Sequence, residues 1–130
     1  MKQNVTLTVL SLLTLLFVIF HLADDIRIGL APPGLSNLIG IAVAAVWLYG
    51  TLALAGRRSG YIIVLLGSIV GVGVPVIHMR GPHGMLGPHL TQAGGIFFFV
   101  WTLLAMGTMA AVCVILSVHG LWSLRSGQAR

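Results

Sequence analysis

Two parts of this chain carry side chains that could bind a metal ion. The first, HLADD at 21–25, closes an apolar stretch; on a helix its imidazole and two carboxylates, spaced i, i+3 and i+4, share one face. The second, IHMRGPHGMLGPHL at 77–90, holds three of the five histidines of the chain. Imidazole and carboxylate groups are ligands of zinc, and also of copper, nickel and iron. We therefore predict a site for zinc or another divalent transition metal, formed from His21, Asp24, Asp25, His78, His83 and His89.

Three members of this set are the strongest candidates for ligands, namely His21, Asp25 and His78. They stand at the ends of predicted helices, whereas glycines lie beside His83 and His89 and leave that loop less rigid. Bonds to zinc are about 2.0–2.2 Å long, so ligand atoms of one metal-free site should lie roughly 3–4 Å apart. The hypothesis therefore requires that these three side chains converge on one point.

The same residues could instead form a structural ion-pair cluster at the boundary between membrane and water. Asp24 could pair with Arg27 at i, i+3, and either acid could pair with Arg80 across the bundle. The HLADD segment matches no motif with a diagnostic mechanism, and the chain contains no HExxH pattern. The sequence therefore specifies no reaction.

Composition places these residues in a membrane protein. The chain is 58% hydrophobic and only 7% charged, whereas soluble domains carry about 25% charged residues. The net charge of +5 comes from seven basic residues scattered along the whole length, which form no patch, so nucleic acid is excluded as a partner. The single cysteine, Cys113, rules out a disulfide within the chain.

The chain is predicted to form one transmembrane domain, residues 1–130, folded as an all-α, antiparallel four-helix transmembrane bundle. A membrane-spanning helix needs about 20 apolar residues. Four stretches meet this requirement, at about 5–23, 37–55, 61–77 and 95–118. Short connections rich in glycine and proline separate them, which favours antiparallel packing of consecutive helices.

The distribution of charge predicts the orientation of the bundle. With four spans, the two termini and the middle loop share a side that holds five cations and no acid: Lys2, Arg57, Arg58, Arg125 and Arg130. The opposite side holds two arginines and both acids. The positive-inside rule therefore places the N- and C-termini in the cytoplasm and makes the histidine and aspartate cluster outward-facing.

Patterns within the predicted helices indicate how they pack. Polar residues recur on the first helix at spacings of three, four and seven, and should face the bundle interior. They are Asn4, Thr8, Ser11, Thr14, His21 and Asp25. On the third helix, Gly67 and Gly71 form a GxxxG pair that lets another helix approach closely. Pro75 then either kinks this helix and aims His78 inward, or marks its end.

Four segments resemble those of small, uncharacterised bacterial four-span membrane proteins. They are WLYGTL at 47–52, RRSGY at 57–61, PVIHMRG at 75–81 and FFVWTL at 98–103. The resemblance extends over nearly the whole chain and implies a multi-pass protein of the bacterial inner membrane. It implies no activity and no functional residue.

The predicted function is that of a small integral membrane protein whose outward-facing His/Asp cluster binds a divalent metal. One alternative is an accessory or structural subunit of a larger membrane complex. Another is a small ion- or proton-coupled transporter that acts as an oligomer and uses Asp25 or His21 as a relay. A haem or quinone site with His21 and His78 as axial ligands is a further alternative. The expected partners are the lipid bilayer and either a second copy of the chain or a membrane complex.

Overall fold

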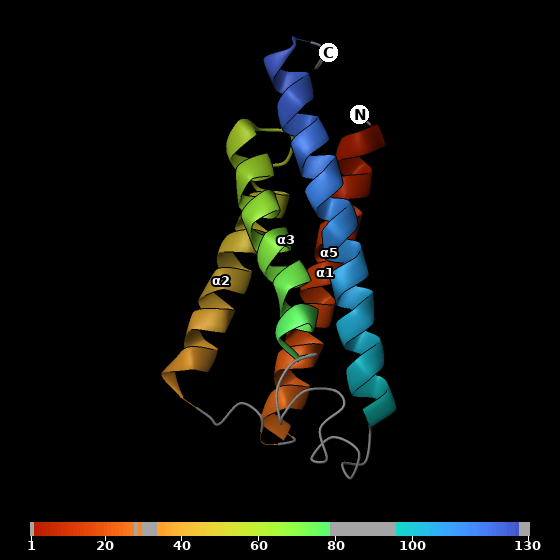
Figure 1. The fold of residues 1–130 in the computed structure, drawn as a ribbon. Helices are drawn as coiled ribbons and strands as arrows, with labels where there is room; N and C mark the ends of the chain where they lie inside the picture. Colours follow the sequence, from red (N-terminus) through yellow and green to blue (C-terminus); the bar gives the residue numbers. More distant parts are fainter. Residues whose placement is uncertain (1, 28, 30–33, 79–95, 128–130) are drawn as a thin grey trace.

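The described part of the chain consists of helices. The structure, a computed structural model, describes residues 2–27, 29, 34–78 and 96–127. These residues form four helices and contain no strand; the helices are α1 (Lys2–Arg27), α2 (Leu35–Leu52), α3 (Arg58–His78) and α5 (Ile96–Arg125) (Figure 1). The all-α prediction is confirmed.

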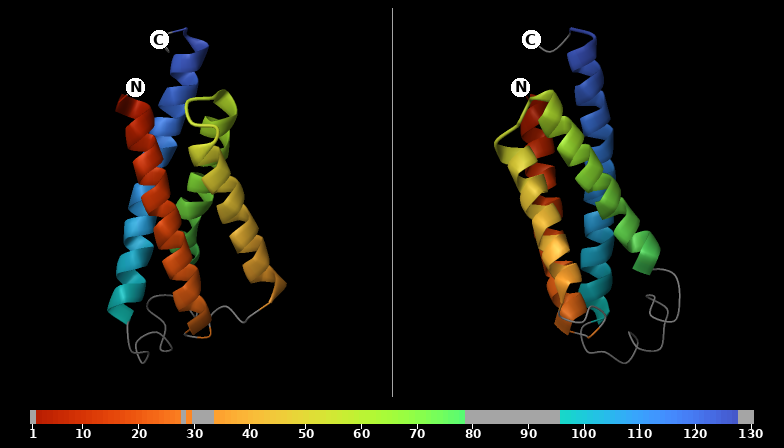
Figure 2. Two further views of the ribbon diagram at one scale, coloured as in Figure 1. Left: turned by 180° about the vertical axis from the view of Figure 1, so that it is seen from behind. Right: turned by 90° about the vertical axis from the view of Figure 1, so that its left-hand side faces the viewer.

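Consecutive helices run in alternating directions along the bundle (Figure 1). The beginning of α1, the turn between α2 and α3, and the end of α5 therefore lie at one end of the molecule. The end of α1, the end of α3 and the beginning of α5 lie toward the other. Helix α5 packs extensively on α3 and α1, whereas α2 diverges from the other helices toward Leu35 (Figure 2).

Three of the helices are long and apolar enough to cross a membrane, namely those at Asn4–Arg27, Arg58–His78 and Phe97–Arg125. The protein is therefore a helical membrane protein. Helix α2 has 18 residues and a shorter apolar part, Asn37–Leu52. At 1.5 Å per residue α2 is about 27 Å long, slightly less than the roughly 30 Å of a bilayer's hydrocarbon core. That this second stretch also spans the membrane stays a prediction.

The predicted polar stripe of α1 faces the inside of the bundle, although Asn4 and Thr8 at its beginning are only partly buried. Ser11 and Thr14 are completely buried. The Ser11 hydroxyl lies 2.7 Å from the Thr51 hydroxyl of α2 and accepts a hydrogen bond of 2.8 Å from Nε1 of Trp47. In hydrocarbon a polar group needs a protein partner, so these contacts specify which face of α1 meets α2.

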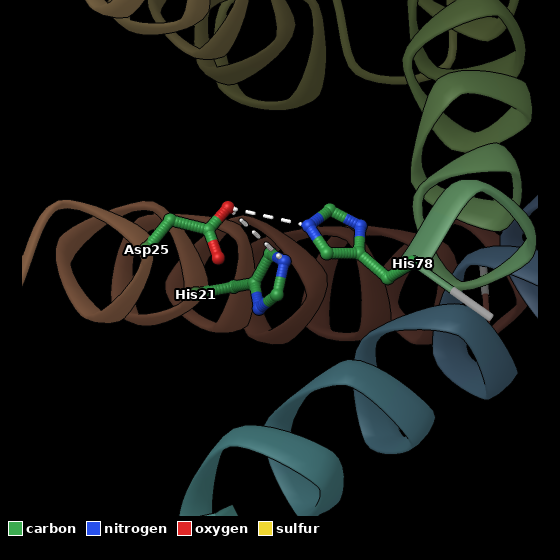
Figure 3. A group of neighbouring side chains, drawn as sticks. All are labelled: His21, Asp25 and His78. Atoms are coloured by element: carbon green, nitrogen blue, oxygen red, sulfur yellow. Dashed lines mark ion pairs between the residues drawn. The ribbon is translucent and has the colours of Figure 1, made fainter. Parts of the chain in front are cut away.

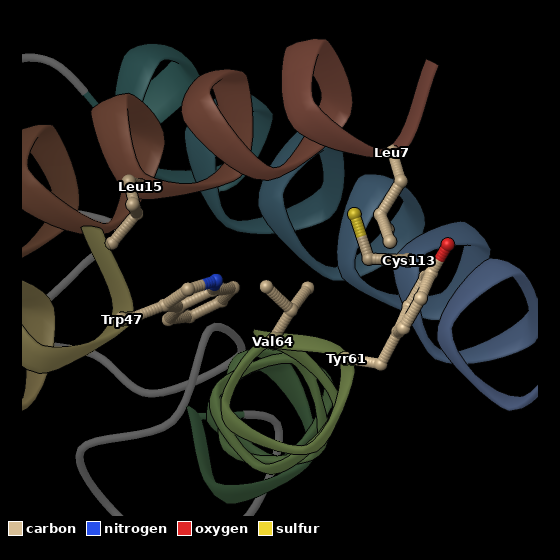
Figure 4. Packing of buried hydrophobic residues seen from close by; sticks show 6 residues of the cluster. All are labelled: Leu7, Leu15, Trp47, Tyr61, Val64 and Cys113. Atoms are coloured by element: carbon tan, nitrogen blue, oxygen red, sulfur yellow. The ribbon is translucent and has the colours of Figure 1, made fainter. Parts of the chain in front are cut away.

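Around this polar pair lies a hydrophobic cluster to which all four helices contribute (Figure 4). Its buried members are Leu7, Leu15, Trp47, Tyr61, Val64 and Cys113. Tyr61 also donates a hydrogen bond from its hydroxyl to Oδ1 of Asn4. The cluster thus combines apolar packing with satisfied polar groups.

Small residues on α3 allow its neighbours to come close. A Cβ atom on Gly67 would collide with the indole ring of Trp47, and a Cβ on Gly71 would lie 3.0 Å from Cβ of Ala110 on α5. The predicted GxxxG pair is thus a contact surface for both α2 and α5. Pro75 lies inside α3, which continues to His78, so the proline does not end the helix.

Candidate metal centre

One carboxylate oxygen meets two imidazoles where α1 and α3 end. Oδ2 of Asp25 lies 3.5 Å from Nε2 of His21 and 3.4 Å from Nε2 of His78 (Figure 3). One ligand atom from each residue lies within 4.8 Å of the other two. Bonds of about 2.0–2.1 Å at tetrahedral angles would put neighbouring ligand atoms about 3.3 Å apart. Both carboxylate–imidazole distances are close to this value, whereas the two imidazole nitrogens lie within 4.8 Å of each other.

Helix α1 supplies two of the three side chains from one face. His21 and Asp25 stand four residues apart, so their side chains lie one turn from each other on the face that continues the buried polar stripe. Both are buried, with 4% and 9% of their surface exposed. The local geometry of a helix is therefore sufficient to bring these two groups together.

Helix α3 supplies His78 in an orientation that its own backbone constrains. Nδ1 of His78 lies 2.9 Å from the carbonyl oxygen of Val74, one turn earlier. A carbonyl oxygen can only accept, so Nδ1 carries the hydrogen. Nε2 therefore faces Asp25: as an imidazolium it donates to the carboxylate, and as a neutral imidazole it offers its lone pair to a metal ion. Histidines that bind metals are commonly held in this way by a backbone carbonyl on the second ring nitrogen.

Helix α5 closes the site with apolar side chains. Phe99, only 1% exposed, has its ring centroid 4.9 Å from that of His21 and 5.9 Å from that of His78. The two imidazoles meet edge to face at 4.7 Å. Leu103 and Met106 continue the apolar cluster along α5. Such surroundings screen charge weakly, so the site favours a balanced set of charges.

The two neighbouring acids differ in how their charge is compensated. Asp24 accepts a hydrogen bond of 2.8 Å from Nε of Arg27, three residues later. Asp25 has only the two histidines as ion-pair partners within the described part of the chain. A buried carboxylate is costly without a positive partner. A second proton on one of the histidines, or a cation among the three side chains, would compensate the carboxylate.

The side-chain polar atoms of His21 and one oxygen of Asp25 make no hydrogen bond within the described part of the chain. They are Nδ1 and Nε2 of His21 and Oδ1 of Asp25. Buried polar groups are normally hydrogen-bonded, so unpaired ones ask for an explanation. A metal ion bound through Nε2 would satisfy one of these atoms and balance the carboxylate.

Of the six residues predicted for the site, the structure brings three together, His21, Asp25 and His78. Asp24 is directed to Arg27, as the ion-pair interpretation predicts. His83 and His89 lie outside the described residues, as does Arg80.

The expectation of an outward-facing cluster needs a correction. His21, Asp24 and Asp25 are buried, and His78 is partly buried. The physical reason is that the face of α1 that carries His21 and Asp25 also carries Ser11 and Thr14, and this face packs against other helices. The cluster therefore lies between helices and does not project from an outer surface.

Two neighbours of the site were not among the predicted residues. The carbonyl of Val74 follows from helical geometry, because it lies four residues before His78. Phe99 belongs to an aromatic run at 97–101, but no sequence signal tells which of these rings faces the histidines. The alternative of a haem bound between His21 and His78 does not fit this geometry. The two imidazoles meet edge to face with centroids 4.7 Å apart, which leaves no space for a porphyrin between them.

No protein-family model, curated protein or solved structure matches this chain. The resemblance to small bacterial four-span membrane proteins accordingly stays a prediction. Any functional conclusion has to come from the chemistry of the side chains.

Proposed function

We propose that this protein binds a divalent transition metal through His21, Asp25 and His78. The observation that carries the proposal is that one oxygen of Asp25 lies within 3.5 Å of Nε2 of two histidines on different helices. Two imidazole nitrogens and one carboxylate oxygen form a donor set that suits zinc and ferrous iron. Neutral histidines around Asp25 leave one negative charge, which a divalent cation would more than balance.

The three ligands within the described part of the chain would by themselves leave at least one coordination position open. Structural zinc sites usually have four protein ligands, whereas sites with three keep a position for water or a substrate. The donor set therefore suits a centre that exchanges its metal or offers it to a second molecule. Delivery, sensing and metal-assisted reactions all need this open position.

The proposed location is the inner membrane of a bacterium, with both termini in the cytoplasm. The support is the charge of the chain: Arg57, Arg58 and Arg125 are exposed at the end of the bundle opposite Asp24 and Asp25. By the positive-inside rule, the basic end faces the cytoplasm. The metal would then enter from the outer side.

Metal analysis of the purified protein tests this function. The full chain in detergent is stripped with a chelator, incubated with zinc or, without oxygen, with ferrous iron, and separated from free metal. Elemental analysis by mass spectrometry should find about one metal ion per chain, since the described residues contain one such three-residue group. Asp25→Asn, His21→Ala and His78→Ala should each remove most of the bound metal.

Two variants are matched controls. Asp24→Asn removes the same charge from the neighbouring position but leaves the three ligands intact, and His119→Ala removes an exposed histidine from α5. Both should keep the metal. The proposal would be refuted if the wild-type protein stayed folded but bound neither zinc nor ferrous iron. Equal amounts of bound metal in Asp24→Asn and Asp25→Asn would refute the proposal as well.

A further inference from the structure

A groove lies at the end of the bundle opposite the candidate metal centre. It runs between the first turns of α3 and the last turns of α5 and has a volume of about 830 Å³. Arg58 and Arg125 line it, and Trp122, which is 74% exposed, stands beside them. Its wall toward the interior of the membrane includes Ile62, Val118 and Leu121. One groove therefore combines two guanidinium groups with a hydrocarbon surface.

Neither acidic side chain of the sequence lies near these two arginines. The only acidic residues of the chain are Asp24 and Asp25, and both lie at the far end of α1 (Figure 1). Two cations that line one groove repel each other, and an anion between them would remove this repulsion. Guanidinium groups bind phosphate oxygens particularly well, through paired hydrogen bonds.

The apolar wall of the groove favours an anion that carries a hydrocarbon chain. Ile62 belongs to the membrane-spanning helix Arg58–His78, and Val118 and Leu121 belong to Phe97–Arg125. A soluble phosphate would use the arginines and leave this wall without a partner. An anionic phospholipid would use both parts of the groove, and tryptophan is favoured at the level of its headgroup.

A second copy of this chain is a poor occupant of the groove. In the same membrane orientation, its two acids would lie at the opposite end of its own bundle from Arg58 and Arg125. It would therefore bring more cations to the groove and no carboxylate side chain. Charge complementarity favours the lipid.

We propose that this groove is a binding site for an anionic phospholipid, with the phosphate between Arg58 and Arg125 and an acyl chain along Ile62, Val118 and Leu121. Basic residues near the membrane surface attract anionic lipids by about 1 kcal/mol each. The site is independent of the metal centre. It would anchor the basic end of the bundle at the membrane surface.

Quenching of Trp122 by brominated lipids tests the site in the full chain. Trp47 is buried and shielded from lipid, so a Trp101→Phe background leaves Trp122 as the tryptophan that lipid can reach. The protein is reconstituted into phosphatidylcholine vesicles containing a small, fixed fraction of brominated phosphatidylglycerol or of brominated phosphatidylcholine. The anionic lipid should quench Trp122 at least about threefold more strongly, since two basic contacts of about 1 kcal/mol each favour its binding.

Charge-matched variants show whether the groove itself is responsible. Arg58→Gln combined with Arg125→Gln should abolish the preference for the anionic lipid, whereas Arg57→Gln should retain most of it. Arg57 is also exposed and carries the same charge but does not line the groove. Equal quenching by both lipids in the Trp101→Phe protein with all arginines present would overturn the proposal, as would an equal loss of the preference in Arg57→Gln. If inorganic phosphate abolished the preference for the anionic lipid, the groove would be a site for the free anion, and the proposal would again be overturned.

Discussion

Nε2 of His78, in the last turn of α3, lies 3.4 Å from Oδ2 of Asp25, near the end of α1. This contact joins two helices that are distant in sequence, and Nε2 of His21 lies 3.5 Å from the same oxygen. A ligand bound by these three residues would connect α1 to α3. Its binding should therefore affect both the stability and the protonation of the protein.

We expect the metal to stabilise the folded bundle. A ligand that binds only the folded state raises the free energy of unfolding by about 2.7 kcal/mol at a free concentration one hundred times its Kd. Thermal unfolding in detergent with and without zinc should show this increase in wild-type protein and in Asp24→Asn. An equal increase in Asp25→Asn would show that zinc acts elsewhere on the chain.

Zinc binding should release protons. In the absence of metal, the Asp25 carboxylate, 3.4 Å from Nε2 of His78, favours an imidazolium at that histidine, and the metal requires neutral imidazoles. About one proton per bound zinc should therefore leave the site near neutral pH. Calorimetric titration in buffers with different ionisation enthalpies measures this number. Acidification should weaken binding, because protons compete with the metal for Nε2; binding that does not change with pH would contradict this mechanism.

Alanine substitutions at two glycines of α3 should have different effects on the stability of the protein. Gly67→Ala places a Cβ in the indole ring of Trp47, and overpacking of this kind costs about 1–3 kcal/mol. Gly73→Ala meets nothing within 4 Å and should be neutral, or stabilise the helix by up to about 1 kcal/mol. Unfolding in detergent, followed by circular dichroism, compares the two variants. Similar effects in both would mean that α2 does not pack on Gly67 as described.

The hydrogen bond between Trp47 and Ser11 should be measurable as an interaction energy. Ser11→Ala leaves Nε1 of Trp47 buried without its acceptor, which costs about 1–3 kcal/mol. The same substitution in a Trp47→Phe background should cost less. A double-mutant cycle should give a coupling of about 0.6 kcal/mol, the average for such bonds in membrane proteins, and at most about 1.7 kcal/mol. Strict additivity would indicate that the two side chains do not interact.

Much of the fold could be predicted because it follows from local rules. The low fraction of charged residues indicates a membrane protein, and long apolar runs with glycine and proline between them indicate helices. The period of 3.6 residues places His21 and Asp25 on one face together with Ser11 and Thr14. The same period made an ion pair between Asp24 and Arg27 foreseeable at i, i+3.

The sequence by itself determined which residues α1 presents to its neighbours, but only the tertiary structure decided what they meet. The position of α3 depends on how side chains fit at its contacts, such as Gly67 against Trp47 and Pro75 against Gly107. That fit carries His78 to Asp25 and sets Phe99 of α5 against both imidazoles. A helix specifies its own faces through the periodicity of its backbone, whereas the contacts between helices depend on the shapes of side chains far apart in the chain.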